Sequence, residues 1–362
     1  MQTQNRRHEE HRGRHEIVAA GHETAGSRAI DPRELSRTLA SYRRPSSSRS
    51  IFELTITLVP FLALLGAMFA ALNAGYWLAL LLVLPAGGLL LRLFLIQHDC
   101  GHGAFFPTRA ANDWVGRSLA LFTLTPYDCW RRSHALHHAR TGNLDGRGFG
   151  DVDTLTVREF LTLSRWKQFL YRLYRHPLVL FGIGPAYLFL LRHRLPVGLM
   201  KEGRRYWISA LTTNAATALL WALLIYLVGF ATFLIVLLPV TLTAASGGVW
   251  LFYVQHQFED AVWDREESWT FHEAALHGSS HLDLPAVLRW FTANVGIHHV
   301  HHLASSIPYY RLPEVLRDNP QLHAVNRLTM WETFKTFRLA LWDEDLRRML
   351  PLSTLRRQAS AS

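Results

Sequence analysis

A long run of residues without charge, 207–254, places the strongest constraint on what this chain can fold into. At roughly 1.5 Å per residue, about 20 apolar residues in a helix cross the hydrocarbon core of a bilayer. The run is therefore long enough for two crossings. Residues 51–73 and 76–96 are similar runs, in which Glu53 and Arg92 are the only charged residues. A buried helix of a soluble protein is usually shorter, so the pattern predicts four transmembrane helices, at 51–73, 76–96, 208–229 and 231–254.

Shorter segments complete the predicted organisation. The apolar segments 118–126 and 177–191 are too short for a crossing and are expected to be interfacial or partly inserted. Asp31 is expected to cap a helix that has Pro32 in its first turn and lies along the membrane. The chain is accordingly divided into a disordered polar tail, one membrane domain and a C-terminal tail: residues 1–30, 31–350 and 351–362.

The distribution of charge predicts the orientation of the spans. The chain has a formal net charge of +10, and 16 Lys and Arg lie between the second and third spans, in residues 97–206. The turns within each pair of spans, "NAGY" and "VGFAT", are uncharged. The positive-inside rule then places both termini and the long middle segment in the cytoplasm, which suggests a bacterial inner membrane. The basic charge suits membrane lipids and acidic proteins, and the sequence contains no nucleic-acid-binding motif.

Three histidine clusters carry the chemical signal: "HDCGH" at 98–102, "HALHH" at 134–138 and "HHVHH" at 298–302. Their spacings of three and four residues place the rings on one face of a helix. Buried, hydrogen-bonded histidines explain one such ring but not eight with this spacing. Because two spans separate the second cluster from the third, all three are expected on the same side of the membrane. The clusters therefore predict a metal site.

The number of rings indicates which metal chemistry to expect. Eight imidazoles exceed the ligands of one ion, so two metal ions are implied. Imidazole suits zinc, copper, iron and nickel. Zinc usually takes four ligands and performs no redox chemistry. A paired iron site that activates O2 makes the best use of many neutral nitrogen ligands beside a membrane.

The sequence around these clusters resembles a known family. The stretches "QHDCGHGAFF", "WRRSHALHHARTGNLD", "FYVQHQFED" and "NVGIHHVHHLASSIPYYRL" are similar to the histidine boxes of the integral-membrane fatty acid desaturases. They are most like the bacterial and plant-type acyl-lipid enzymes, which include the omega-6 (Δ12) desaturases. The resemblance implies an all-α integral membrane protein, in which four transmembrane helices carry a cytoplasmic helical cap that holds a histidine-rich di-iron site. It also implies O2-dependent removal of two hydrogens from an acyl chain.

The resemblance assigns metal-ligand roles to the three boxes and to a ninth histidine just beyond the fourth span: His98, His102, His134, His137, His138, His256, His298, His301 and His302. Two histidines depart from the family pattern, namely His299 inside the third box and His281 before it. Groups expected to orient the ligating rings are Asp99, Glu259 and Asn294, since metal-bound imidazoles usually donate their second nitrogen to a carboxylate or another acceptor.

The boxes leave alternatives open. A hydroxylase or ketolase that acts on lipids, alkanes or carotenoids would share the scaffold. A metal transporter is a more remote alternative, because the helix interiors hold no His or Asp along a path through the bilayer. The sequence shows neither the His-Pro-Gly-Gly motif of a b-type cytochrome domain nor the four cysteines of a ferredoxin, so a separate electron donor is expected, with a ferredoxin as the best candidate. Arg-rich segments could dock it, or could contact phospholipid: Arg131, Arg132, Arg172, Arg175, Arg204 and Arg205.

Overall fold

A computed structural model describes residues 32–148 and 150–359. The polar tail at 1–30, the expected cap at Asp31 and the last residues of the C-terminal tail lie outside the described residues. The chain divides into two units after Thr38. Helix α2 (Pro32–Ala40) contains the boundary. All that follows concerns the unit that begins at Leu39.

In the described part of the chain, four helices are long and apolar enough to cross a membrane: Ser47–Asn73, Trp77–His102, Arg204–Val228 and Phe230–His256. They are α3, the pair formed by η1 (Trp77–Leu82) and α4 (Val83–His102), α10 and α11. The four predicted spans and the membrane fold class are thus confirmed.

The helices of the second and fourth spans continue past their apolar runs. Hydropathy reports only the segment that prefers lipid, whereas a helix continues while its backbone hydrogen bonds are made. Helix α4 ends only where Gly103 takes a left-handed conformation with φ 72°. As a result, α4 carries the first box to His102, and α11 carries the chain to His256.

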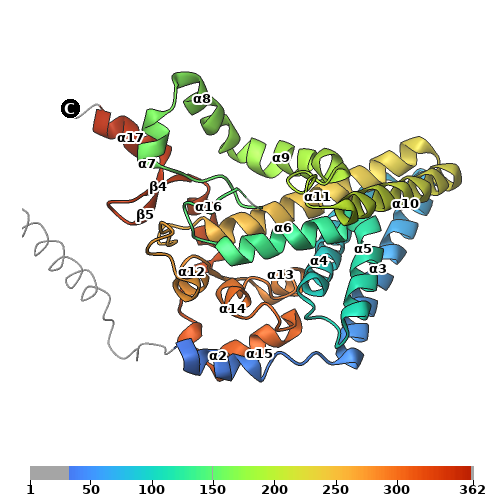
Figure 1. The fold of residues 1–362 in the computed structure, drawn as a ribbon. Coiled ribbons are helices and arrows are strands. Elements are labelled where there is room, and N and C mark those ends of the chain that lie inside the picture. Colours follow the sequence, from blue (N-terminus) through green and yellow to red (C-terminus); the bar gives the residue numbers. More distant parts are fainter. Residues whose placement is uncertain (1–31, 149, 360–362) are drawn as a thin grey trace, which may run out of the picture. The chain divides into compact units, whose positions relative to one another are not determined.

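Helix α4 is the central helix of the membrane part and packs against α3, α11 and α5 (Figure 1). Its contact with α11 is close: a Cβ on Gly87 would lie 2.6 Å from the side chain of Thr243. The absence of a side chain at Gly87 therefore lets the two helices approach, as small residues commonly do in membranes.

The segment between the second and third spans is mostly helical. Helix α5 contains most of the apolar segment 118–126, and the segment 177–191 forms irregular helical turns, many of them π-type. Their placement at the membrane interface stays a prediction. The elements are α5 (Arg109–Thr123), α6 (Tyr127–Arg140), α7 (Val157–Thr162), α8 (Arg165–Tyr174), η2 (Val179–Ile183), α9 (Gly184–Ala186), η3 (Tyr187–Leu191) and η4 (Arg192–Arg194).

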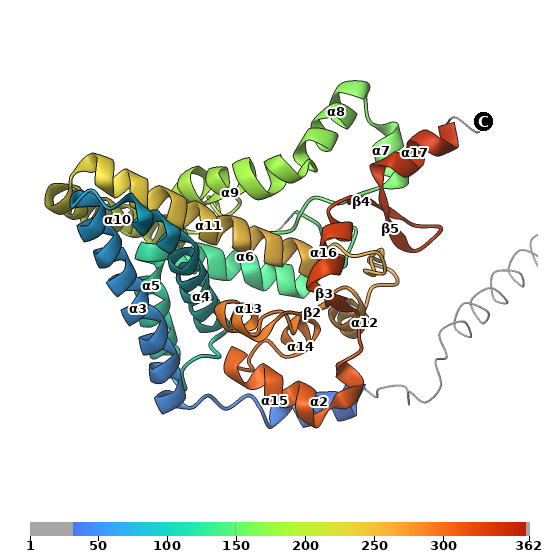
Figure 2. The same ribbon diagram turned by 180° about the vertical axis from the view of Figure 1, so that it is seen from behind.

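The residues after the fourth span form short helices, several of which lie beside α6 and the end of α11 (Figures 1 and 2). The elements are α12 (Phe271–His277), α13 (Ala286–Phe291), α14 (His298–Leu303), η5 (Tyr309–Arg311), α15 (Leu312–Asp318), η6 (Pro320–Leu322), α16 (Met330–Thr336) and α17 (Leu352–Ala359).

Short strands join these helices, which the all-helical expectation did not include. Strands β1 (Leu155–Thr156), β4 (Leu339–Asp343) and β5 (Arg348–Pro351) form one sheet in that order, with β1 parallel and β5 antiparallel to β4. Strands β2 (His281–Asp283) and β3 (Arg327–Thr329) form a parallel pair. The strands tie the chain's last third to the segment after α6 and to the segment before α14.

Candidate metal centre

Nine histidines converge in two groups within the described part of the chain, and they are the nine that the sequence singled out. The larger group has five rings and the smaller has four. Within each group the candidate ligand nitrogens all lie within 4.8 Å of one another. The larger group is His98, His102, His134, His138 and His301, and the smaller is His137, His256, His298 and His302.

The helices explain how the rings are divided between the groups. Helix α4 contributes only to the larger group and α11 only to the smaller. Helices α6 and α14 contribute to both, so these two helices fix the separation of the groups. In α14, His301 faces the larger group while His298 and His302 face the smaller. The spacing of three and four residues therefore serves two neighbouring sites rather than one.

The nitrogens approach one another as ligands of a common ion would. The Nε2 atom of His298 lies 3.0 Å from that of His256 and 3.1 Å from that of His302. In the larger group, the Nε2 atom of His138 lies 3.0 Å from that of His134 and 3.1 Å from that of His301. A neutral imidazole has only one N–H, so several Nε2 atoms directed at one another cannot all be satisfied by mutual hydrogen bonds.

Some ring nitrogens lack a hydrogen-bond partner in the described part of the chain, as expected if these residues bind a metal. The Nε2 atoms of His102 and His137 are buried and have no hydrogen-bond partner among the described residues. Burial and neighbouring rings also hold the pKa well below its usual range for several rings, which keeps them in the neutral form that binds metal. These rings are His134, His138, His298, His301 and His302. The set fits a pair of imidazole-bound metal ions.

Groups around the rings can fix their orientation. One Asp99 carboxylate oxygen lies 3.3 Å from Nδ1 of His98, as the sequence suggested. The carbonyl oxygen of Gly278 lies 3.2 Å from Nδ1 of His256. The carboxylate of Asp151 hydrogen-bonds Nδ1 of His137. Each contact leaves the Nε2 atom of its ring available to a metal.

The other two expected orienting groups have different partners. Glu259 is an exposed residue whose carboxylate lies 3.4 Å from the guanidinium of Arg348. Asn294 donates a long hydrogen bond, 3.4 Å, to the carbonyl oxygen of Tyr309. The structure thus places neither side chain in a recorded contact with a ligand ring. Asp151 contacts a ligand ring instead, that of His137. It lies in a loop whose sequence has no helical or strand periodicity, so no local pattern predicted this contact.

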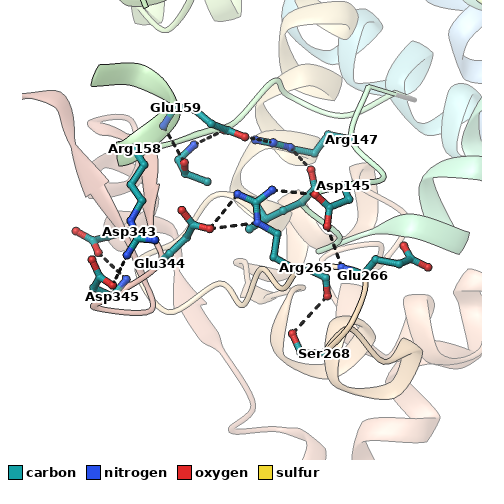
Figure 3. Close-up of polar contacts among 12 residues, drawn as sticks. Asp145, Arg147, Arg158, Glu159, Arg265, Glu266, Ser268, Asp343, Glu344 and Asp345 are labelled. Carbon is teal, nitrogen blue, oxygen red and sulfur yellow. Dashed lines mark hydrogen bonds and ion pairs between the residues drawn. The ribbon is translucent and has the colours of Figure 1, made fainter. Parts of the chain in front are cut away.

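A network of ion pairs holds the loop that contains Asp151. Figure 3 shows Arg265 between Asp145 and Glu344, with contacts of 2.8 and 2.9 Å. Two residues after Asp145, Arg147 reaches the carboxylate of Glu159 in α7, with one contact of 2.6 Å. The network joins the segment after α6 to the turn between β4 and β5. The described residues on either side of Asp151 are thus linked to Arg265, to Glu159 and to the turn between β4 and β5.

The remaining histidines near the third box have partners of their own. The Nε2 atom of His299 lies 2.8 Å from the carbonyl oxygen of Leu322, and burial lowers the pKa of His299 to about 3. Nδ1 of His281 lies 2.8 Å from the carbonyl oxygen of His323. Neither His299 nor His281 belongs to the two metal groups.

Comparisons with known proteins agree with the motifs. The chain matches the family model of the fatty acid desaturases over residues 73–334. It is 37% identical over 326 residues to the fatty acid desaturase of Bacillus subtilis (strain 168), which covers 90% of this chain and 92% of that protein.

Two cyanobacterial relatives are more distant. The sn-1 acyl-lipid omega-3 desaturase (ferredoxin) of Synechocystis sp. is 31% identical over 232 residues, which is 62% of this chain and 63% of that protein. The sn-1 oleoyl-lipid 12-desaturase of Anabaena variabilis is 26% identical over 268 residues, covering 66% and 70%. The resemblance of the histidine boxes thus extends over most of the sequence, and the protein is an oxidoreductase that belongs to the fatty acid desaturase family.

Proposed function

We propose that the protein introduces a double bond into an acyl chain carried on a membrane lipid, at the omega-6 (Δ12) position. The similarity to an oleoyl-lipid 12-desaturase supports the substrate class and the position. The similarity to an acyl-lipid omega-3 desaturase supports the lipid-linked substrate. It also makes the omega-3 position the alternative site for the double bond. The observation that carries the proposal is the convergence of nine histidines at the ends of membrane helices.

The proposed cofactor is a pair of iron ions held by the nine histidines, with O2 as co-substrate. Bound iron with O2 would supply the oxidising power that an unactivated methylene C–H requires and that no general base provides. The division into five and four rings supports two ions. The protein's own contribution is to hold neutral rings in place and to keep water from the reacting carbon.

Apolar and aromatic side chains lie between the interior of the membrane part and the larger group. A small cavity of about 20 Å³ between α4, α5 and α11 is lined mainly by apolar side chains, including Leu90, Phe94 and Phe189. The ring of Phe94 lies 5.5 Å from that of Trp130, and Trp130 stacks on His134 at 4.5 Å. Aromatic side chains therefore connect the apolar interior of the membrane part with the histidine rings, and they would direct a methylene group rather than water toward them.

The proposed electron donor is a separate ferredoxin. The word "ferredoxin" in the name of the Synechocystis relative supports this choice. Two of the arginines expected to dock a donor are already paired: Arg131 lies 2.9 Å from Asp113, and Arg132 lies 3.0 Å from Glu202. These arginines present less free charge to a partner than the sequence alone suggested.

The proposed location is a bacterial inner membrane, with the histidine groups and both termini in the cytoplasm. The four apolar helices support a membrane protein, and the uncharged turns between paired spans support this orientation. Residues 31–350 are proposed to form the single desaturase domain.

Expression in a bacterial host that lacks this activity tests the function. Gas chromatography–mass spectrometry of derivatised fatty acids should show a new double bond at Δ12. A double bond at the omega-3 position would show that the proposed position is wrong but would leave the proposed desaturase function standing. A hydroxylated or keto product would instead support the alternative on the same scaffold. A variant that lacks His138 and His302 provides the inactive control.

A further inference from the structure

Glu53 and Arg92, the charged residues of the apolar runs 51–73 and 76–96, meet inside the protein, and the exposed Arg49 also lies 2.6 Å from the Glu53 carboxylate. Glu53 of α3 and Arg92 of α4 form an ion pair, and their side chains are 3% and 2% exposed. Nε of Arg92 also donates to Oγ1 of Thr57 at 3.1 Å. The guanidinium lies 4.2 Å from the centre of the Trp290 ring and donates to the carbonyl oxygen of Trp290.

Stability alone does not account for this pair. Removing two charges from water costs several kcal/mol per ion, on the order of what their attraction returns, and apolar replacements of a buried pair are often neutral or stabilising. The cost is greater still in a membrane, where charged residues usually serve a function. The pair therefore needs a role beyond holding α3 against α4.

The contacts of Tyr309 connect the pair to the first histidine box. The Tyr309 hydroxyl lies 3.0 Å from the Glu53 carboxylate and 3.1 Å from Nη2 of Arg92. The backbone N–H of the same residue donates to the carboxylate of Asp99 at 2.7 Å. Asp99 in turn contacts Nδ1 of His98 at 3.3 Å. One residue is thus fixed by its side chain to the ion pair and by its backbone to the group that orients a candidate ligand.

We propose that the Glu53–Arg92 pair positions the ring of His98, acting through Tyr309 and Asp99. The pair holds Tyr309 at a set depth against α4, and Tyr309 holds the Asp99 carboxylate toward the ring. Because η5 lies far along the chain from α3 and α4, the same contacts also fix the first box relative to the segment after the third. Glu53, Arg92 and Tyr309 are positioning residues and touch neither metal nor substrate. This inference rests on the proposed function of His98 as a ligand.

The test replaces both charges together, so that no buried charge is left unpaired. The Glu53→Leu/Arg92→Met variant should reach parent levels in the membrane and melt within a few degrees of the parent protein. Purified apo protein in lipid nanodiscs is titrated with Fe(II) alone, and the bound iron is counted. The variant should bind iron in the larger group about 10–100-fold more weakly, the range typical for loss of a ligand-orienting partner. Tyr309→Phe should show the same direction with a smaller effect.

Tyr310→Phe provides the matched control, because the Tyr310 hydroxyl bonds instead to the backbone N–H of Ser46 at 2.9 Å. A double variant that binds iron as the parent does would refute the positioning role. If the parent itself bound no iron, the proposed metal function would fail instead. If the double variant were unstable, Tyr309→Phe would serve as the test, because it removes only one hydroxyl group. Parent-like iron binding by a stable Tyr309→Phe protein would also refute the proposal.

A second observation concerns helix α8, which presents an apolar stripe outward. Its large apolar side chains recur at helical spacing and are all exposed, by 65, 52, 42 and 47%: Trp166, Phe169, Leu170 and Leu173. The opposite face carries Tyr171, which packs with Phe160 and Leu341 in a buried cluster. The helix is thus anchored to the protein by one face, while its other face resembles that of an interfacial membrane helix.

We infer that the α8 stripe rests in the cytoplasmic leaflet and that anionic lipid headgroups bind beside it. Exposed Arg165 and Lys167 flank the stripe on its two sides and match such headgroups in charge. Beyond α8 the chain continues with exposed Leu178 and Ile183 into turns that pack against the membrane helix α11. The stripe is therefore continuous with exposed apolar side chains of segment 177–191, which is expected to lie at the membrane interface.

A spin label at Leu170→Cys tests this inference, in a Cys129→Ser background and in nanodiscs of phosphatidylglycerol. Dissolved O2 should reach the label, whereas a water-soluble nickel complex should not; a label at Lys167→Cys should be reached by nickel. Changing Arg165 and Lys167 to Gln should reduce the burial of the label in phosphatidylglycerol but not in phosphatidylcholine. Access of nickel to Leu170→Cys would overturn the inference, as would exclusion of both reagents, which would indicate a protein contact.

Discussion

Two adjacent histidines of the third box have different surroundings, although their sequence context is the same. His298 directs Nε2 toward His256 at 3.0 Å, whereas His299 directs Nε2 toward the carbonyl oxygen of Leu322 at 2.8 Å. One helical position turns a side chain by about 100°, which separates the two rings. The difference should be visible in function, since only the first ring lies in a metal group.

His298→Ala should lower iron content and desaturation by more than about 100-fold, beyond what loss of an orienting partner costs. His299→Ala should retain iron and activity. It should still lose about 1–3 kcal/mol of stability, because it removes a buried hydrogen-bonded group. Product analysis and iron content at matched protein levels check both outcomes. An iron-free His299→Ala protein beside an active His298→Ala protein would show that the ligand assignment is wrong. His281→Ala and His277→Ala should also remain active.

Another histidine outside the boxes makes stability depend on pH. Burial, and then the charges of Arg194 and Arg192, lower the pKa of His193 to about 3. In the unfolded chain its pKa is about 6.5. The folded protein therefore cannot take up the proton that the unfolded chain binds below pH 6.5. The contribution of His193 to the free energy of unfolding is therefore fully present above about pH 6.5. It decreases as the pH falls toward 3, by at most about 1.4 kcal/mol per pH unit.

His193→Phe should reduce this acid sensitivity and keep the contact with the Phe189 ring, now 5.1 Å from His193. Unfolding in detergent between pH 4 and 7 measures the slope for both proteins. The parent should lose stability faster than the variant as the pH falls. Equal slopes would mean that the His193 ring takes up its proton in the folded state.

At the scale of the element, the loop after α6 shows what sequence periodicity could and could not reveal. The box residues lie on α4, α6 and α14, where spacings of three and four repeat along a helix, and the sequence placed them correctly on those helices. Asp151 lies 14 residues beyond His137 in an irregular loop, and ion pairs from distant segments hold that loop. No local pattern encodes such a contact: the sequence suggested Glu259, whereas the structure brings the Asp151 carboxylate against the ring of His137.

Asp151→Asn should test the contribution of this loop to the smaller group. The amide keeps the size of the side chain but loses the charge that favours donation by Nδ1 of His137. Iron affinity or activity should fall about 10–100-fold. Glu259→Gln is the matched control and should leave both unchanged, since its carboxylate faces Arg348 at the surface. Equal effects of the two substitutions would assign no special role to Asp151.

At the scale of the whole molecule, the membrane helices were predictable and the cap was only partly so. Apolar runs are strong local signals, and they gave the four spans to within a few residues at most ends. The strands of the cap have two to five residues and pair distant segments, as Leu155 does with Leu341. Such short strands show no clear alternation, so their pairing depends on the tertiary structure rather than on the local sequence.

The meeting of the histidine groups also constrains how the whole molecule can lie in a membrane. The first box ends the second span at His102, and His256 ends the fourth, yet both ends reach the two neighbouring histidine groups. Both spans must therefore end on the same side of the bilayer, and the Arg-rich segment 97–206 favours the cytoplasm for that side.

A reporter that is active only in the periplasm should therefore stay inactive when fused after Ser362, and a cytoplasmic reporter there should be active. Fusions in the turn at Gly75 should give the opposite result and serve as the control. An active periplasmic reporter at Ser362 would contradict the four-span arrangement, in which three spans lie between Gly75 and Ser362. It would also separate α14 from α4 by a bilayer, which the 4.6 Å between the rings of His98 and His301 does not allow.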